Sequence, residues 1–190
     1  MSESMNHLMW YTSRATGVVA VVLMTAILVL GMMVKAGAGT SEQSTVMMGI
    51  HRNLSMGMSA FIGLHVVTAI METYVDIGWM SLLVPFTSGY STLWIGLGTL
   101  AFDAFAAVLV TSLLRERIAD HQWRLIHWFS YGLWGFALIH GFALGTSNEP
   151  VLRAVSVLCA LAGGFAIVKS VQSRDDREDE RRRVAAQEWS

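Results

Sequence analysis

Three long stretches without a charged side chain restrict the fold of this sequence more than any other feature. Residues 15–34, 53–71 and 125–148 number 20, 19 and 24, and none of them is Asp, Glu, Lys or Arg. About 20 mostly apolar residues in a helix span the hydrocarbon core of a bilayer, and an ionised side chain at its centre costs roughly 3 kcal/mol. Each stretch is therefore long and apolar enough to form one membrane-spanning helix.

Two further apolar stretches extend the pattern. Residues 91–114 are interrupted only by Asp103, and residues 151–168 carry Arg153 and Lys169 at their ends, where long side chains reach water. The sequence thus predicts an all-α integral membrane protein, a bundle of five transmembrane helices. One domain is expected over residues 1–171, followed by a charged cytoplasmic tail over 172–190. The helices are expected at about residues 10–34, 47–73, 91–114, 124–145 and 150–170.

The composition excludes several other classes of protein. Only 14% of the residues are charged, against roughly 25% in a soluble domain, and the formal net charge is −1. These values fit neither a water-soluble fold nor a basic surface for nucleic acid. The single cysteine, Cys159, lies in an apolar stretch, so disulfides and thiolate metal clusters are not expected. Residues 73–90, with Pro85 and Gly89, are too polar and broken to span and are expected along the membrane interface.

The positions of Lys and Arg predict how the helices are oriented, because basic residues gather on the cytoplasmic side. With five spans, Arg14 and Arg153 fall on one side of the membrane. The opposite side collects Lys35, Arg52, Arg115, Arg117, Arg124, Lys169 and the arginines of the tail. We therefore expect a multi-pass protein of the cell membrane with its N-terminus outside and its C-terminus in the cytoplasm. The second and fourth helices would then both run from cytoplasm to exterior.

Four of the six histidines lie on these two parallel helices. His51 precedes His65 by 14 residues, and His127 precedes His140 by 13, separations of roughly 21 and 20 Å along a helix. His51 is therefore expected to meet His127 near the cytoplasmic face, and His65 to meet His140 near the outer face. A single buried histidine is usually a packing residue, but four at paired depths indicate a functional site, since ionisable groups in a membrane are costly.

A flat ligand gripped between two imidazoles fits each pair. Haem iron accepts an axial histidine on both sides, and a porphyrin can lie between helices in an apolar interior. The sequence therefore predicts two haem groups, an inner one on His51 and His127 and an outer one on His65 and His140, in a four-helix haem-binding core. Zinc is less favoured because its ligands converge on one point. The glycines expected to let a macrocycle approach the backbone are Gly57, Gly63, Gly132, Gly135 and Gly141.

The spacing of 13 residues creates a geometric difficulty. At about 100° per residue, 14 residues return a side chain to within about 40° of the same helix face, whereas 13 residues leave it about 140° away. The fourth helix is therefore expected to be distorted, either by a kink at its glycines or by a tightened first turn at His127.

Several other polar or aromatic residues have two possible roles. Arg14, Arg52 and Arg124 are candidates for binding haem propionates, although snorkelling at the membrane interface explains them as well. Asp103 is either a proton relay, or the partner of another polar group, or a hydrogen-bonded structural carboxyl. Trp134 either packs in the core or lies between the haems, and core packing is the stronger expectation.

The histidine pattern resembles the ferric reductase-like transmembrane domain, the membrane part of ferric reductases and NADPH oxidases. In that family two histidines 14 residues apart on one helix and two 13 apart, two spans later, ligate an inner and an outer haem b. His51 and His65, then His127 and His140, match this arrangement. The likeness covers about residues 10–145 and includes the strings WYTSRATG (10–17), HRNLS (51–55), LHVVTA (64–69) and RLIHW (124–128).

The resemblance implies a di-haem protein that passes electrons across the lipid bilayer, from a cytoplasmic flavoprotein or quinol to an external acceptor. After Lys169 only about 20 residues follow and no nucleotide-binding glycine motif is found, so no flavin or NAD(P)H site is expected. The chain is closer to stand-alone haem subunits, such as the membrane partner of periplasmic methionine sulfoxide reductase. It is expected to be an oxidoreductase subunit without a catalytic side chain of its own. The alternative is a non-redox transporter or assembly factor whose histidines bind protons or a metal.

Overall fold

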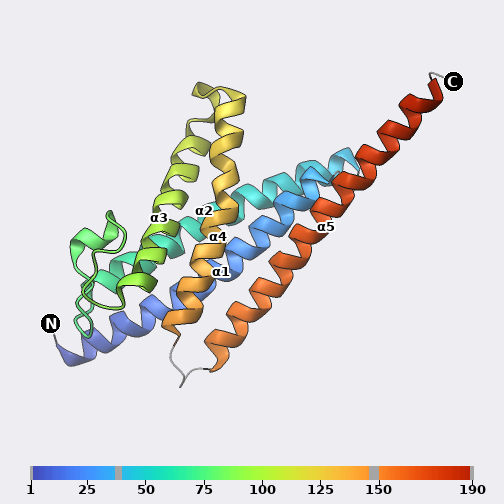
Figure 1. Cartoon of the computed structure of the whole chain (residues 1–190). Helices are drawn as coiled ribbons and strands as arrows, with labels where there is room; N and C mark the ends of the chain where they lie inside the picture. The colour runs from blue at the N-terminus through green and yellow to red at the C-terminus, as the bar shows by residue number, and fades with distance from the viewer. Residues whose placement is uncertain (1, 37–39, 146–149, 189–190) are drawn as a thin grey trace.

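The computed structural model describes residues 2–36, 40–145 and 150–188, without the side chains of residues 174, 176, 177, 179–181, 186 and 188. These residues form five long α-helices and two short 3-10 helices, with no strand among them. The long helices are α1 (Glu3–Lys35), α2 (Ser41–Met71), α3 (Thr92–Leu113), α4 (Asp120–Leu144) and α5 (Pro150–Glu188); the short ones are η1 (Trp79–Leu82) and η2 (Arg115–Arg117) (Figure 1).

Four helices in the described part of the chain are long and apolar enough to cross a membrane. They are α1, α2, α3 and the Pro150–Ser173 portion of α5. The prediction of an all-helical, multi-pass membrane protein is confirmed at this level. The remaining long helix, α4, is more polar, because it carries Asp120, Arg124 and three histidines.

Capping residues explain why α1 and α2 begin earlier than predicted from hydropathy. The Ser2 side chain accepts a hydrogen bond from the Met5 backbone N–H, which caps α1. At the start of α2, Thr40 and Gln43 form a capping box, in which each side chain satisfies the other's backbone N–H. At the other end of the chain, α5 continues as a helix to Glu188, through the predicted tail. The tail residues Arg174, Arg177 and Arg181 lie outside the described side chains.

The helices are arranged as two antiparallel pairs. α1 packs along α2, and α3 packs along α4, while α5 lies against α1 and α4. Figure 1 shows the α3–α4 pair crossing the α1–α2 pair at a steep angle. Within the described residues, α2 and α4 scarcely pack against each other, although these are the two helices that carry the four histidines. The space between them is bridged by side chains rather than by close backbone packing.

Trp134 of α4 lies at the centre of the apolar core. Its indole N–H donates to the Thr25 hydroxyl of α1 at 3.0 Å, and its ring packs so closely against Gly163 of α5 that no Cβ fits there. The side chain is only 8% exposed and is surrounded by other buried residues such as Met24 and Leu133. Trp134 therefore joins three helices, as core packing predicted.

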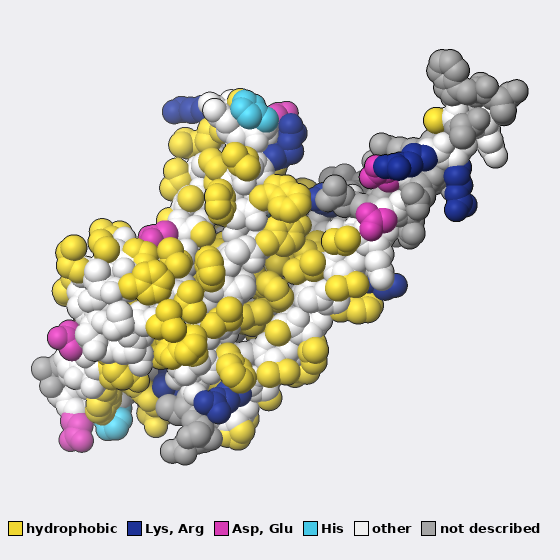
Figure 2. All heavy atoms as spheres, viewed as in Figure 1, with side chains coloured by type: hydrophobic (Ala, Val, Ile, Leu, Met, Phe, Trp, Pro, Cys, Tyr) yellow, Lys and Arg dark blue, Asp and Glu magenta, His cyan; other side chains and the backbone are white. Residues whose placement is uncertain are grey.

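The segment between α2 and α3 packs against α3 and does not form a membrane-spanning helix. The Thr99 hydroxyl donates to the Ser81 carbonyl at 2.6 Å, and Phe86 packs directly against Gly96. Trp79 and Leu83 remain largely exposed. On the face drawn in Figure 2, Lys and Arg side chains lie toward the two ends of the bundle, and the surface between them is mostly apolar.

Candidate functional site

The four histidines of α2 and α4 meet in the two predicted pairs. The ring centres of His51 and His127 are 6.4 Å apart, and those of His65 and His140 are 6.2 Å apart. The planes of the two rings make an angle of 51° in the first pair and 85° in the second. The described residues contain no group of three or more His, Cys, Asp or Glu that could share an ion, so the histidines form pairs and not a cluster.

Both distances agree with two imidazoles on opposite sides of one metal ion. Metal–imidazole bonds are about 2.0 Å long and the ring centre lies about 1.1 Å behind the ligating nitrogen, so a linear arrangement places the centres about 6.2 Å apart. A tetrahedral ion such as zinc would bring the same two centres to about 5 Å. The observed 6.4 and 6.2 Å leave room for one ion between the two imidazoles of each pair and are longer than the distance expected for a tetrahedral ion.

Three of the four imidazoles are oriented by a backbone carbonyl on the neighbouring helix. The Nδ1 atoms donate to carbonyl oxygens at 2.7–3.1 Å: His51 to Ile27, His65 to Ser13 and His140 to Trp94. Since a carbonyl oxygen only accepts, Nδ1 carries the hydrogen in each case and Nε2 keeps the free lone pair. Histidines that ligate metals are commonly held in this way, which also raises the basicity of the ligating nitrogen.

Each of these carbonyls is accessible to the imidazole because the residue four positions later on the same helix is glycine. A helical side chain leans back over the preceding turn, so the residue at i+4 normally covers the carbonyl of residue i. For His140, the carbonyl is that of Trp94 and the residue at i+4 is Gly98. A Cβ at position 98 would lie 2.5 Å from the imidazole of His140. Only glycine leaves room for this ring.

The same arrangement occurs twice on α1, which carries no histidine of either pair. A Cβ at Gly17 would lie 2.9 Å from the His65 imidazole, and a Cβ at Gly31 would lie 3.4 Å from the His51 imidazole. The two glycines are 14 residues apart, and so are the two histidines on the antiparallel helix α2. Each glycine therefore lies opposite one of the histidines. The sets of carbonyl, glycine and histidine are Ser13, Gly17 and His65, and Ile27, Gly31 and His51.

A cavity adjoins the second pair. It has a volume of about 250 Å³, and both His65 and His140 line it together with Gly17, Gly98 and Arg14. A single water or metal ion needs only about 10–15 Å³ in the same measure, so the cavity is suited to a much larger ligand. Most of its other walls are aliphatic or aromatic, as a porphyrin requires.

His127 is the exception among the four histidines. Its Nδ1 is buried, and it has no hydrogen-bond partner among the described residues. The ring instead stacks on Trp123, four residues earlier on α4, with ring centres 4.8 Å apart and planes inclined by 20°. The first pair is therefore supported asymmetrically, by a carbonyl on one side and by an aromatic ring on the other.

The tightened first turn predicted for the fourth helix is not found. α4 is α-helical at every residue from Asp120 to Leu144, and because it begins at Asp120, His127 is its eighth residue and lies well inside it. The steep crossing of the helix pairs explains how both histidines still reach α2 (Figure 1). When two helices cross, the direction from one to the other rotates along their length. Side chains on different faces of α4 can thus meet residues of α2.

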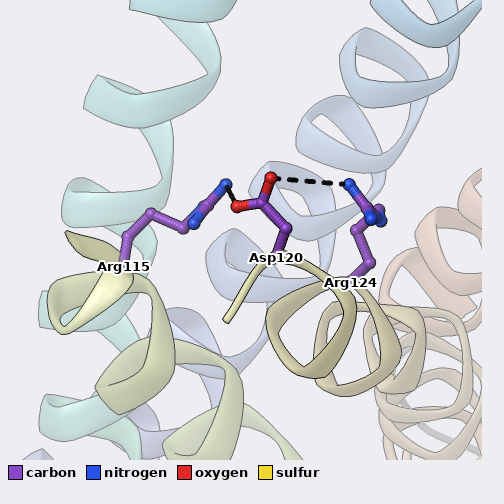
Figure 3. Close-up of polar contacts among 3 residues, drawn as sticks. All are labelled: Arg115, Asp120 and Arg124. Carbon is purple, nitrogen blue, oxygen red and sulfur yellow. Dashed lines mark hydrogen bonds and ion pairs between the residues drawn. The ribbon is translucent and has the colours of Figure 1, made fainter. Parts of the chain in front are cut away.

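The arginines predicted to contact propionates differ in their positions. Arg14 lines the cavity of the second pair, where its guanidinium lies over the Trp10 ring at 4.0 Å. Arg52 is exposed, and no recorded contact links it to the first pair. Arg124 is exposed and faces Asp120 at 4.0 Å; Figure 3 shows this carboxylate between Arg124 and Arg115, whose guanidinium is 2.6 Å away.

The glycines singled out from the sequence have open space beside them, and Gly141 lines the cavity of the second pair. A Cβ would meet no described protein atom within 4 Å at any of these positions: Gly57, Gly63, Gly132, Gly135 and Gly141. The glycines that make room for imidazoles lie on α1 and α3, and the matched 14-residue spacing on α1 is the sequence signal that points to two of them. Asp103 is half-buried on α3.

Comparison of the chain with family models, with curated proteins and with solved structures finds no match.

Proposed function

We propose that this chain is a di-haem membrane protein that carries electrons across the bilayer, with one haem b held by His51 and His127 and a second by His65 and His140. The observation that carries the proposal is the facing geometry of the two pairs, 6.4 and 6.2 Å between ring centres. In addition, Nδ1 of three of the four rings is already engaged by a carbonyl, which leaves Nε2 as the ligating atom.

A haem held by both histidines of a pair would supply one-electron redox chemistry and would favour electron transfer over oxygen binding. The side chains of this protein hold and orient the ligating atoms, and no protein nucleophile or base is required. Arg14, at the cavity of the second pair, is suited to bind a propionate there.

The proposed membrane topology has five spans, with α4 as the fourth. α4 pairs along its length with the apolar helix α3, and its polar side chains include the two proposed ligands, which supports a place in the bilayer despite its lower hydropathy. The excess of basic residues then places Lys35 and Arg115 on the cytoplasmic side. On this basis the His51–His127 pair is the inner site and the His65–His140 pair the outer site, in the cell membrane.

The resemblance to the ferric reductase-like family supports a direction from a cytoplasmic or quinol donor to an external acceptor. The donor would be a separate flavoprotein or a quinol. Adding each to purified protein, and following the reduced haem spectrum, distinguishes the two donors.

The proposal is tested by the cofactor content of the purified full-length chain. After expression in haem-replete cells and reduction with dithionite, the protein should show a low-spin b-type spectrum with about two haems per chain in the pyridine haemochrome assay. His65→Ala or His140→Ala should remove about one haem per chain. His121→Ala is the matched control, because it changes an exposed histidine near the start of the same helix. A colourless wild-type protein would refute the proposal and favour a non-redox role.

A further inference from the structure

A stack of three side chains leads from the surface of the bundle to His127. The Arg115 guanidinium lies over the Trp123 ring at 4.8 Å, and the other neighbour of that ring is the His127 imidazole, also at 4.8 Å between centres. Asp120 accepts a hydrogen bond from Arg115 at 2.6 Å, as Figure 3 shows. The ion pair thus fixes the guanidinium over the indole, and the indole covers one face of the imidazole.

His127 lacks the backbone support that the other three histidines have. Its Nδ1 atom is buried and has no hydrogen-bond partner among the described residues, so the stacked Trp123 ring is the contact that can orient the imidazole.

We propose that Trp123 is a positioning residue for the inner haem ligand: by stacking, it fixes the orientation of the His127 ring, which backbone carbonyls do for the other three histidines. The inference rests on the proposed function, because it concerns the residue that orients one of the four ligands. Residues four apart lie on the same face of a helix, so Trp123 reaches His127 without distorting α4. A stacked ring holds the imidazole plane without supplying a hydrogen-bond acceptor to Nδ1.

The angle between the two ligand planes gives this role a spectroscopic signature. In a low-spin ferric haem, the largest electron paramagnetic resonance g value rises as the two axial imidazole planes turn from parallel toward perpendicular. The inner pair is inclined by 51° and the outer by 85°, so the two sites should give separate signals. Without Trp123 the His127 plane is free to rotate, and only the inner signal should change.

The test uses the purified full-length protein with both haems bound. Trp123→Ala should broaden or move the inner signal and leave the outer one in place, whereas Trp123→Phe, which keeps a ring to stack, should retain both. Loss of haem to apomyoglobin from the inner site should be about fivefold faster in Trp123→Ala, which corresponds to roughly 1 kcal/mol for an aromatic pair. Trp128→Ala is the control, since Trp128 adjoins His127 in sequence but pairs with Tyr131.

A second variant keeps the test decisive if Trp123→Ala does not fold. Arg115→Gln removes the cation that lies over the indole and should shift the inner signal in the same direction by less, whereas Arg117→Gln, which removes the same charge from the same turn, should not. Unchanged inner signals in Trp123→Ala, or equal changes at both haems, would overturn the inference while leaving a two-haem wild type intact. A wild type without haem would instead overturn the proposed function.

Discussion

The Nδ1 atom of His140 lies 2.8 Å from the carbonyl oxygen of Trp94, in a space that is open only because the residue four positions after Trp94 is glycine. An imidazole that donates to a carbonyl cannot rotate freely, and its other nitrogen keeps the lone pair that can bind a metal. The orientation of the His140 ring therefore depends on a neighbouring helix as well as on the helix that carries the histidine.

Gly98→Ala should selectively disable the outer site. The added methyl would lie 2.5 Å from the His140 ring, so the imidazole must leave its position. We expect about one haem per chain to be lost, measured by the pyridine haemochrome assay, even though Ala is favoured over Gly in a helix by about 1 kcal/mol.

Two other glycines provide graded controls for this variant. Gly31→Ala should keep both haems, because its Cβ would approach His51 only to 3.4 Å, a distance that a small ring movement relieves. Gly49→Ala, whose Cβ meets nothing within 4 Å, should also keep both. A Gly98→Ala protein with two haems would show that the carbonyl contact does not orient the ligand.

The two haems of the wild type should differ in their electron paramagnetic resonance spectra. With planes inclined by 85°, the pair of His65 and His140 should give the larger maximal g value, and the pair of His51 and His127, inclined by 51°, the smaller. His140→Ala should remove the first signal and His127→Ala the second. Two identical signals would contradict the ring orientations described here.

Replacing Gly163 should destabilise the bundle, whereas replacing the adjacent glycine should not. Gly163 packs directly against the buried indole of Trp134, and forcing a methyl into such a contact typically costs about 1–3 kcal/mol. Gly164 has nothing within 4 Å of an added Cβ, so Gly164→Ala is the matched control. Thermal unfolding in detergent should show a lower Tm for Gly163→Ala alone. Equal Tm values for both variants would mean that α5 is not packed on α4 at this residue.

Asp120 should titrate below its ordinary value. The hydrogen bond from Arg115, and then the positive charge of that residue, lower the pKa of the carboxyl from 3.8. A carboxyl whose pKa falls on folding stabilises the folded state fully above 3.8, and this contribution is lost as the pH falls through the lower, folded-state pKa. Carbon-13 NMR of the carboxyl in micelles should show the low pKa. Arg115→Gln should raise it toward 3.8, and Arg124→Gln should raise it less; equal effects would contradict the geometry.

Hydropathy and the spacing of histidines were sufficient to predict the helices and the pairing of the rings. Long apolar stretches are stable in a bilayer as helices, and four of the five long helices are apolar and long enough to span. His51 facing His127 and His65 facing His140 also follow, because matched spacing on two parallel helices puts equal depths together.

The glycines and backbone carbonyls that orient the histidines could not be predicted in the same way. Gly17, Gly31 and Gly98 lie on helices that carry none of the four paired histidines. Their role depends on how α1 and α3 pack beside α2 and α4. The 13-residue spacing suggested a distorted helix because the prediction assumed helices lying side by side. The steep crossing of the helix pairs, a property of the tertiary structure, removes that need.

The repeated carbonyl and glycine on α1 tie the length of that helix to the length of α2. Inserting or deleting one residue between Gly17 and Gly31 would swing one of the two supports by about 100° around the helix axis, while His51 and His65 kept their places. A matching change between the two histidines would be needed to restore both contacts. During evolution, this part of α1 and the ligand-bearing part of α2 are therefore expected to gain or lose residues only together.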